Sequence, residues 1–189
     1  MSAVQPDTSP VYQLKVTLRR SDPPIWRRLQ VRGDTTLARL HTLLQRAMGW
    51  SDSHIHEFDV GGVRYGVPIM EWPPEERARN ERRFRLDQIV ATVGDQFVYD
   101  YDFGDAWHLD VLVEAVLLPE PGTRYPRCLA GARACPPEDV GGIPGYADFL
   151  AALGDPDHYE HELWTEWIGG SFDPEALDIE AINRRLRPR

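Results

Sequence analysis

The sequence has few cysteines, almost no lysine and no long hydrophobic run. Its 189 residues include two cysteines, Cys128 and Cys135, and a single lysine, Lys15. No stretch of about 18 apolar residues occurs, so we expect no membrane-spanning helix. The polar segment 1–10 lacks the pattern of a signal peptide. We expect a disordered tail there and a cytoplasmic location, where a structural disulfide is the less favoured state of the two thiols.

Acidic residues outnumber basic ones, and the two halves of the chain differ in charge. The net charge is -9 at pH 7, with +3 on residues 1–94 and -12 on residues 95–189. Proteins that bind nucleic acid through its phosphates usually carry a basic surface. The overall balance therefore argues against nucleic-acid binding, although the arginines from Arg77 to Arg85 leave a local basic patch as an alternative.

The common signatures of catalysis are also missing. The chain contains no Gly-x-Ser-x-Gly element, no phosphate-binding Gly-Lys-Ser/Thr loop and no Gly-x-Gly-x-x-Gly element. Nothing in the sequence therefore indicates a nucleophile or a bound nucleotide.

What the sequence does contain is a pattern of alternating hydrophobic residues near its middle, in 97–103 and again in 107–113. A period of two is typical of strands with one buried face, and the glycine between the two runs predicts a hairpin. A three-residue turn at 104–106 pairs Tyr101 with Leu109 and places all of the hydrophobic side chains on one face.

The polar face of this hairpin is the first candidate binding surface. In the predicted register Asp102 faces His108, and Asp100 faces Asp110. Facing carboxylates repel unless a cation or solvent lies between them, and a carboxylate favours protonation of a neighbouring imidazole. An ordinary solvated sheet face is the alternative. The candidate binding residues, including two on a later loop, are Asp100, Asp102, Asp105, Trp107, His108, Asp110, Glu138 and Asp139.

The segments before the hairpin predict two further pairs of strands and one helix. Alternation predicts a hairpin of strands 11–18 and 25–31, and hydrophobic residues at helical spacing predict a helix over 36–48, capped by Thr35 or Thr36 and ended by Gly49. A strand follows at 54–60, and a short one at 63–67. The mixed charges of 68–83 indicate a solvated excursion, and 84–90 predicts one or two helical turns.

The segments after the hairpin predict a loop and then helices. Prolines and glycines predict that 119–145 is irregular, because they forbid a long helix or a central strand. Helices are expected within 146–187, with Asp157 and Asp173 as caps. Together these segments predict an α+β fold: a β-grasp-like mixed sheet over 11–118, packed on one main helix, with an extra hairpin and a C-terminal helical layer.

Histidines and carboxylates raise a metal site as a second hypothesis. If the strand at 54–60 lies beside the central hairpin, four side chains converge as a mixed site suited to zinc, manganese or iron: His54, His56, Asp102 and His108. Chance spacing of packing residues is the alternative. Cys128 and Cys135 are separated by too many residues for a zinc knuckle, so packing or a redox-labile pair is favoured for them.

Several sequence blocks occur in one order: Pro-Ile-Trp-Arg-Arg at 24–28, His-Ile-His-Glu-Phe at 54–58, Tyr-Asp-Phe-Gly-Asp-Ala-Trp-His at 101–108, Cys-Pro-Pro-Glu-Asp-Val-Gly-Gly at 135–142, Gly-Tyr at 145–146 and Phe-Asp-Pro-Glu at 172–175. Through these blocks residues 11–186 resemble the plasmid pRiA4b ORF-3-like protein family. The resemblance implies a protein of plasmids and transposable elements and implies no particular reaction. Val140 stands where many relatives have a third cysteine, which disfavours a three-thiolate metal site.

We therefore predict a non-catalytic binding or accessory protein. It would hold a protein partner, such as one encoded by a mobile element, through the polar hairpin face and the loop 125–145. The alternative is a metal-dependent hydrolase with nucleic acid as one candidate substrate. In that hypothesis the four metal ligands hold a divalent ion, and Asp105 or Glu138 is the general base.

Overall fold

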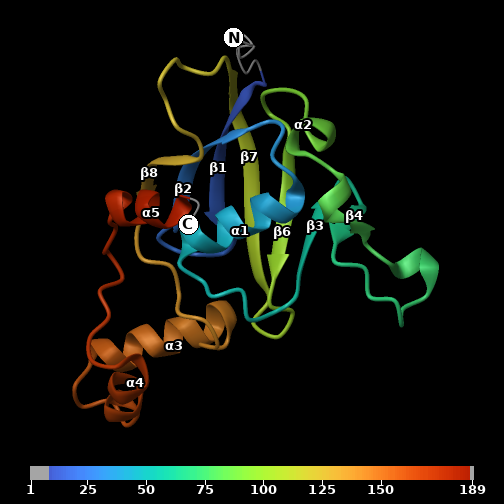
Figure 1. The fold of residues 1–189 in the computed structure, drawn as a ribbon. Coiled ribbons are helices and arrows are strands. Elements are labelled where there is room, and N and C mark those ends of the chain that lie inside the picture. Colours follow the sequence, from blue (N-terminus) through green and yellow to red (C-terminus); the bar gives the residue numbers. More distant parts are fainter. Residues whose placement is uncertain (1–8, 188–189) are drawn as a thin grey trace.

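A computed structural model describes residues 9–187 of the chain and contains one mixed sheet (Figure 1). The sheet has eight strands in the order β5-β4-β3-β6-β7-β1-β2-β8. All neighbouring pairs are antiparallel except β4 and β5. The strands are β1 (Val11–Leu18), β2 (Trp26–Arg32), β3 (His56–Val60), β4 (Val63–Gly66), β5 (Arg79–Asn80), β6 (Gln96–Tyr101), β7 (Trp107–Leu117) and β8 (Arg127–Ala132).

Helices cover one face and one end of this sheet. α1 (Leu37–Met48) lies across the sheet, with α5 (Ile179–Leu186) beside it and against β8 (Figure 1). The short α2 (Leu86–Ile89) precedes β6, while α3 (Gly142–Gly154) and α4 (His161–Ile168) pack together beyond one end of the strands. The prediction of an α+β fold is confirmed, and the β-grasp likeness stays a prediction. Across residues 9–187, no helix has both the length and the hydropathy needed to cross a membrane.

The main helix forms as its sequence predicts. Thr36 accepts a hydrogen bond from the Arg39 N–H at 3.2 Å, which satisfies one of the free donors in the first turn. Gly49 ends the helix with a φ of 89°, a left-handed conformation that favours glycine. The hydrophobic side of α1 packs on the sheet, and it buries the leucines 37, 40, 43 and 44 almost completely.

The β6–β7 hairpin is present, but its register differs from the prediction by two residues. Tyr101 pairs with Trp107 rather than with Leu109. Because the shift is an even number of residues, the paired side chains of the two strands stay on their predicted faces. The hydrophobic face of the two strands is therefore still buried, and its side chains at 0% exposure are Tyr99, Tyr101, Trp107, Leu109, Val111 and Val113. Beyond the paired residues the prediction is wrong: Phe103, expected on the buried face, is 49% exposed, and Asp102, expected on the open polar face, is 7% exposed.

Asp102 explains the difference in register. It leaves β6 with a φ of 54°, and its N–H donates to the Ile55 carbonyl at 3.0 Å. Its Oδ1 accepts hydrogen bonds from the N–H groups of Gly104 and Asp105 at 3.0 and 3.3 Å. A side chain that bonds to the backbone two residues later is typical of a turn. The connection therefore spans residues 102–106, longer than the predicted turn.

Two segments expected to be irregular contain strands at the edges of the sheet. Residues 68–83 include β5 and two 3-10 helices, Pro74–Glu76 and Glu81–Arg83. Residues 119–145 include β8, and α3 begins within them at Gly142. An edge strand has a partner on one side only. β8 therefore tolerates Gly131 within the strand and Pro126 just before its first residue.

The caps predicted for the last two helices are wrong. α4 begins at His161 and leaves Asp157 outside it, and α5 begins at Ile179 rather than just after Asp173. Asp178 caps α5 by accepting a hydrogen bond from the Ala181 N–H at 2.8 Å. C-terminal helices still contribute to the core, as the sequence predicted, through Tyr146 and Phe149 of α3 and Ile182 and Leu186 of α5.

Candidate functional site

The polar face of the β6–β7 hairpin consists of charges that pair with one another. His108 Nδ1 contacts Asp100 Oδ1, so Asp100 rather than Asp102 lies opposite this histidine. Arg19 Nε donates to both carboxylate oxygens of Asp110 at 3.1 Å. This hydrogen bond is the main cause that raises the pKa of Arg19. Two of the carboxylates predicted to bind a partner, Asp100 and Asp110, are thus engaged by other side chains of the protein.

Two further candidate binding residues have structural roles. Trp107 is 0% exposed and stacks on Trp50 with ring centroids 5.9 Å apart, so it is not available to a partner. Glu138 Oε2 accepts a hydrogen bond from the Ser51 N–H at 2.8 Å, and its Oε1 contacts the Tyr101 hydroxyl. Burial, and then this contact with Glu138, raise the pKa of Tyr101. Glu138 therefore ties its loop to the segment between α1 and β3 and to the end of β6.

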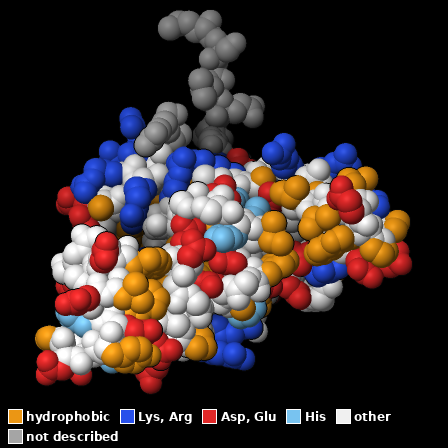
Figure 2. All heavy atoms as spheres, turned by 90° about the horizontal axis from the view of Figure 1, so that it is seen from below, with side chains coloured by type: hydrophobic (Ala, Val, Ile, Leu, Met, Phe, Trp, Pro, Cys, Tyr) orange, Lys and Arg blue, Asp and Glu red, His pale blue; other side chains and the backbone are white. Residues whose placement is uncertain are grey.

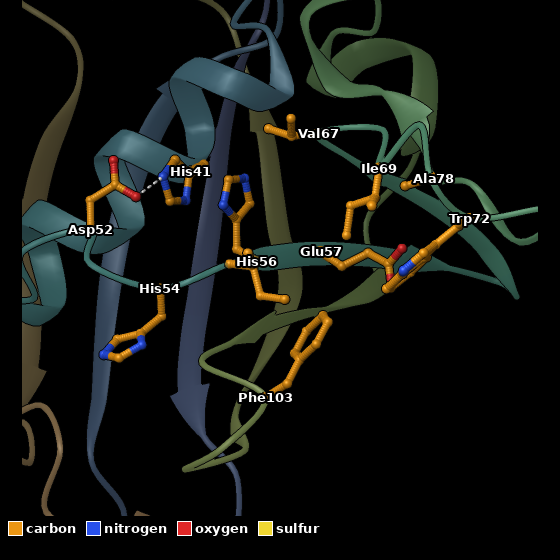
Figure 3. A pocket seen from close by; sticks show the side chains of 11 residues that line it. His41, Asp52, His54, His56, Glu57, Val67, Ile69, Trp72, Ala78 and Phe103 are labelled. Carbon is orange, nitrogen blue, oxygen red and sulfur yellow. Dashed lines mark hydrogen bonds and ion pairs between the residues drawn. The ribbon is translucent and has the colours of Figure 1, made fainter.

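The four predicted metal ligands do not converge, because β3 begins at His56 and leaves His54 in the preceding loop. Figure 3 shows the imidazoles of His54 and His56 pointing in different directions. His54 Nε2 lies 3.6 Å from Asp102 Oδ2 and 3.0 Å from Asp139 Oδ1. His56 joins a different group of side chains, and His108 lies with Asp100. Of the predicted set, only His54 and Asp102 come together.

His56 stacks face to face on His41, a residue of α1. The ring centroids lie 3.5 Å apart and the planes are 6° from parallel. His41 Nε2 lies 2.8 Å from Asp52 Oδ1, and His56 Nε2 lies 2.7 Å from Glu81 Oε2. Burial, and then the charge of His56, lower the pKa of His41. The physical reasons are that a buried site with little water disfavours a charged imidazole, and that a positive charge on the neighbouring ring would repel it.

Hydrogen bonds to Tyr99 favour one neutral tautomer of His41. The amide of Gln45 donates to the Tyr99 hydroxyl at 2.9 Å, and this hydroxyl lies 2.7 Å from His41 Nδ1. The hydroxyl can then donate its own proton to Nδ1, which leaves the proton of His41 on Nε2, facing Asp52. Burial raises the pKa of Tyr99 well above its usual range, so the phenol keeps that proton.

The His41–His56 stack lies against a cavity of about 340 Å³, which we call the β3 pocket. The excursion supplies one side of it, and the loop 102–106 supplies another (Figure 3). Three hydrophobic side chains of this pocket are exposed, Ile55 at 53%, Val67 at 63% and Phe103 at 49%. The lining residues are His41, Asp52, His54, Ile55, His56, Glu57, Val67, Ile69, Trp72, Ala78 and Phe103.

Two arginines of the segment 77–85 form contacts within the protein. Arg77 donates through Nε to the Trp72 carbonyl at 2.7 Å, and Arg85 Nε lies 3.0 Å from Asp87 Oδ1. Arg77 therefore helps to shape the excursion. Figure 2 shows hydrophobic side chains (orange) gathered on the part of the molecule that projects to the right, where Figure 1 places β4 and the excursion.

The sequence reasoning missed most of the β3 pocket. The burial of His41 could have been predicted from helical spacing, because it lies four residues after Leu37 and three before Leu44, on the buried side of α1. The burial of Glu81 could not have been predicted in this way. Its highly charged segment indicates an exposed side chain, whereas the side chain is only 4% exposed. No local pattern marks Trp72 or Phe103, because the pocket forms between segments that are distant in sequence.

Comparison with known proteins places this α+β protein, with its pocket beside two imidazole–carboxylate groups, in a family. The model of the plasmid pRiA4b ORF-3-like protein family matches residues 10–181. The chain belongs to this family, as the sequence blocks predicted.

Two relatives cover nearly the whole chain. An uncharacterized protein of Sinorhizobium fredii, y4hQ, is 41% identical over 178 residues, which are 93% of this chain and 90% of that protein. The crystal structure of MM3350 from Methanosarcina mazei Go1, described as a protein of unknown function, is 36% identical with a TM-score of 0.82, and the match covers 92% of this chain and 97% of that one. These relatives support the fold and the family, and they name no ligand or reaction.

Proposed function

We propose that this protein is a non-catalytic binding protein that holds a hydrophobic segment of a protein partner in the β3 pocket. The observation that carries the proposal is the combination of a cavity of about 340 Å³ with exposed hydrophobic side chains at its edge. Pockets of this size and lining are typical of ligand sites. Hydrophobic side chains exposed around a hollow lose contact with water when a partner covers them.

Glu57 indicates the chemistry of the bound segment. Its side chain lines the pocket at 14% exposure, and Arg64 Nη1 lies 3.6 Å away. Burial is the main cause that raises the pKa of Glu57. A buried carboxylate is stabilised by a hydrogen-bond donor or a positive charge. The segment that fits is therefore a hydrophobic side chain next to a donor or a basic group. The plasmid in the family name supports the further proposal that the partner is a product of the same mobile element. We propose in addition that the two proteins meet in the cytoplasm.

A selection from a displayed peptide library tests this proposal. We expect the selected peptides to share a hydrophobic residue, and we expect Ile55→Asp to weaken their binding at least tenfold, because a charge would enter the apolar edge of the pocket. Leu163→Asp is the matched control, since Leu163 is a similarly exposed leucine (60%) on α4 and should bind like the wild type. Peptides that bind the Ile55 variant and the wild type equally would refute the proposal.

A metal-dependent hydrolase is the second candidate function. The observation in its favour is the grouping of His54 with Asp102 and Asp139. Its predicted general bases are both engaged, because Asp105 Oδ2 accepts a hydrogen bond from the Gly141 N–H at 3.1 Å and Glu138 contacts Ser51 and Tyr101. Hydrolysis of a nucleic-acid or ester substrate that requires added Mn²⁺ and is lost in Asp139→Asn would favour this function over the first.

A further inference from the structure

His54 presents a nitrogen to two carboxylates without forming a hydrogen bond. Its Nε2 is buried and has no hydrogen-bond partner of acceptable geometry among the residues that the structure describes. Nevertheless, Asp139 Oδ1 lies 3.0 Å from it and Asp102 Oδ2 lies 3.6 Å from it. A buried polar atom without a partner is costly and calls for an explanation. The three atoms all lie within 4.8 Å of one another.

The two separations from His54 Nε2 are those expected around a bound metal ion. Imidazole nitrogens and carboxylate oxygens bind zinc at about 2.0–2.2 Å. Two ligands at octahedral or tetrahedral angles are then separated by roughly 3.0–3.5 Å. The distances of 3.0 and 3.6 Å from His54 Nε2 to the two oxygens are close to this range. One ion placed between the three atoms would also satisfy the unpartnered nitrogen.

Backbone contacts hold the two carboxylate loops in position. Asp102 is 7% exposed, and its Oδ1 is occupied by the N–H groups of Gly104 and Asp105, which leaves Oδ2 directed at His54. Asp105 in turn accepts a hydrogen bond from the Gly141 N–H, next to the loop that carries Asp139. The ligand atoms are thus positioned by the fold, so binding would require little rearrangement.

The His41–His56 pair lacks this ability, although its atoms lie as close to Asp52 as a metal site requires. The lone pair of an imidazole nitrogen lies in the plane of its ring, and a metal ion binds along it. Two rings that are stacked 3.5 Å apart and nearly parallel cannot direct their lone pairs at one ion. Both Nε2 atoms are, in addition, already engaged by carboxylates.

We propose that His54 Nε2, Asp102 Oδ2 and Asp139 Oδ1 bind one divalent transition-metal ion, with zinc and manganese as the ions that suit these ligands. Asp139 is an exposed side chain, at 67%, so the remaining coordination positions face solvent. The ion would lie beside the β3 pocket, because His54 also lines that pocket. The inference does not rest on peptide binding, and it fails or succeeds independently of it.

Calorimetric titration of chelator-treated protein with Zn²⁺ and with Mn²⁺ is the first test. We expect one ion per chain, and at least tenfold weaker binding in Asp139→Asn and in His54→Ala. Asp100→Asn is the matched control, because Asp100 forms a similar carboxylate–imidazole pair with His108 and should leave the affinity unchanged. Wild-type protein that binds no stoichiometric ion, or an Asp139 variant that binds as well as the wild type, would overturn the proposal.

X-ray absorption of the zinc-loaded protein identifies the ligands directly. The proposed site contains one imidazole, with oxygen ligands in the other positions, and the imidazole signal should disappear in His54→Ala. Two imidazole ligands, or a signal that persists in the His54 variant, would show that the ion is bound elsewhere and would overturn the proposal. Circular dichroism of each variant establishes that it is folded. If His54→Ala does not fold, Asp139→Asn still tests the proposal.

Discussion

The imidazole rings of His41 and His56 lie face to face, with centroids 3.5 Å apart, although they come from a helix and a strand that are separated by a loop. Each ring also faces a carboxylate through its Nε2. The stack lines the β3 pocket and joins α1 to β3. A charge on His41 would disturb this arrangement, and the stability of the protein should therefore depend on pH.

The first prediction concerns that dependence. Because burial and the neighbouring imidazole lower the pKa of His41, the unfolded chain binds more protons at this residue than the folded one below pH about 6.5. The contribution of neutral His41 to the free energy of unfolding is therefore complete above that pH and is lost as the pH falls. We expect the free energy of unfolding in urea to decrease less between pH 7 and pH 5 in His41→Gln than in the wild type. Equal decreases in both proteins would contradict the prediction.

The second prediction contrasts two neighbouring arginines on opposite faces of β2. Arg27 is 3% exposed and donates to the carbonyls of Ala132 and Arg133 at 2.9 and 2.8 Å. Arg28 lies on the other face and pairs with Glu114. Removing the buried Arg27 side chain leaves a cavity and takes the donors from two partly buried carbonyls, so Arg27→Ala should reduce the free energy of unfolding by roughly 2–4 kcal/mol.

Arg28→Ala is the control for that experiment. It removes a partly exposed ion pair, and we expect a loss of about 1 kcal/mol or less. Denaturant unfolding of both variants measures the difference. An Arg27 variant that is as stable as the Arg28 variant would show that Arg27 does not hold β2 to the segment after β8.

The third prediction concerns the start of α3. A Cβ at Gly145 would lie 2.0 Å from the Val140 carbonyl oxygen, whereas a Cβ at Gly154, the last residue of the helix, would meet nothing within 4 Å. Overpacking of this kind typically costs about 1–3 kcal/mol, so we expect Gly145→Ala to lower the melting temperature by several degrees. Gly154→Ala should leave it nearly unchanged. A reversed order would contradict the packing at Gly145.

The fourth prediction concerns the two thiols, which are both free in the described part of the chain. Burial raises the pKa of Cys135 to about 11, and burial also raises the pKa of Cys128. Because the thiolate is the reactive form, both should react very slowly with a disulfide reagent at pH 8 in the folded protein. Unfolding in guanidinium should expose two reactive thiols. Rapid reaction of the folded protein would contradict this prediction.

Much of the fold was predictable because its signals are local. The alternation in 97–113 reports which side of each strand is buried, and this holds even where the register is wrong. Thr36 and Gly49 mark the ends of α1 through bonds to residues of the same helix. The edge strands β5 and β8 were missed because their pairing depends on distant partners, and their own composition favours loops.

The candidate site was predictable only in part, for the same reason. His54 and Asp102 were selected as possible ligands, and they do lie together, but the choice of His56 and His108 assumed a strand that begins too early and the wrong hairpin register. Asp139 was named as a binding residue without its partner. The loop that follows β8 brings Asp139 close to His54. No pattern in the sequence predicts where this loop lies.

The sequence by itself determined the α+β fold, the buried face of each main strand and the family to which the chain belongs. Only the tertiary structure decided which imidazole faces which carboxylate and that a pocket opens beside β3. Hydrophobic period and helix caps act between residues a few positions apart. Ligand geometry, by contrast, depends on how turns such as 102–106 bring distant segments within a few ångströms, and a turn of different length changes every partner beyond it.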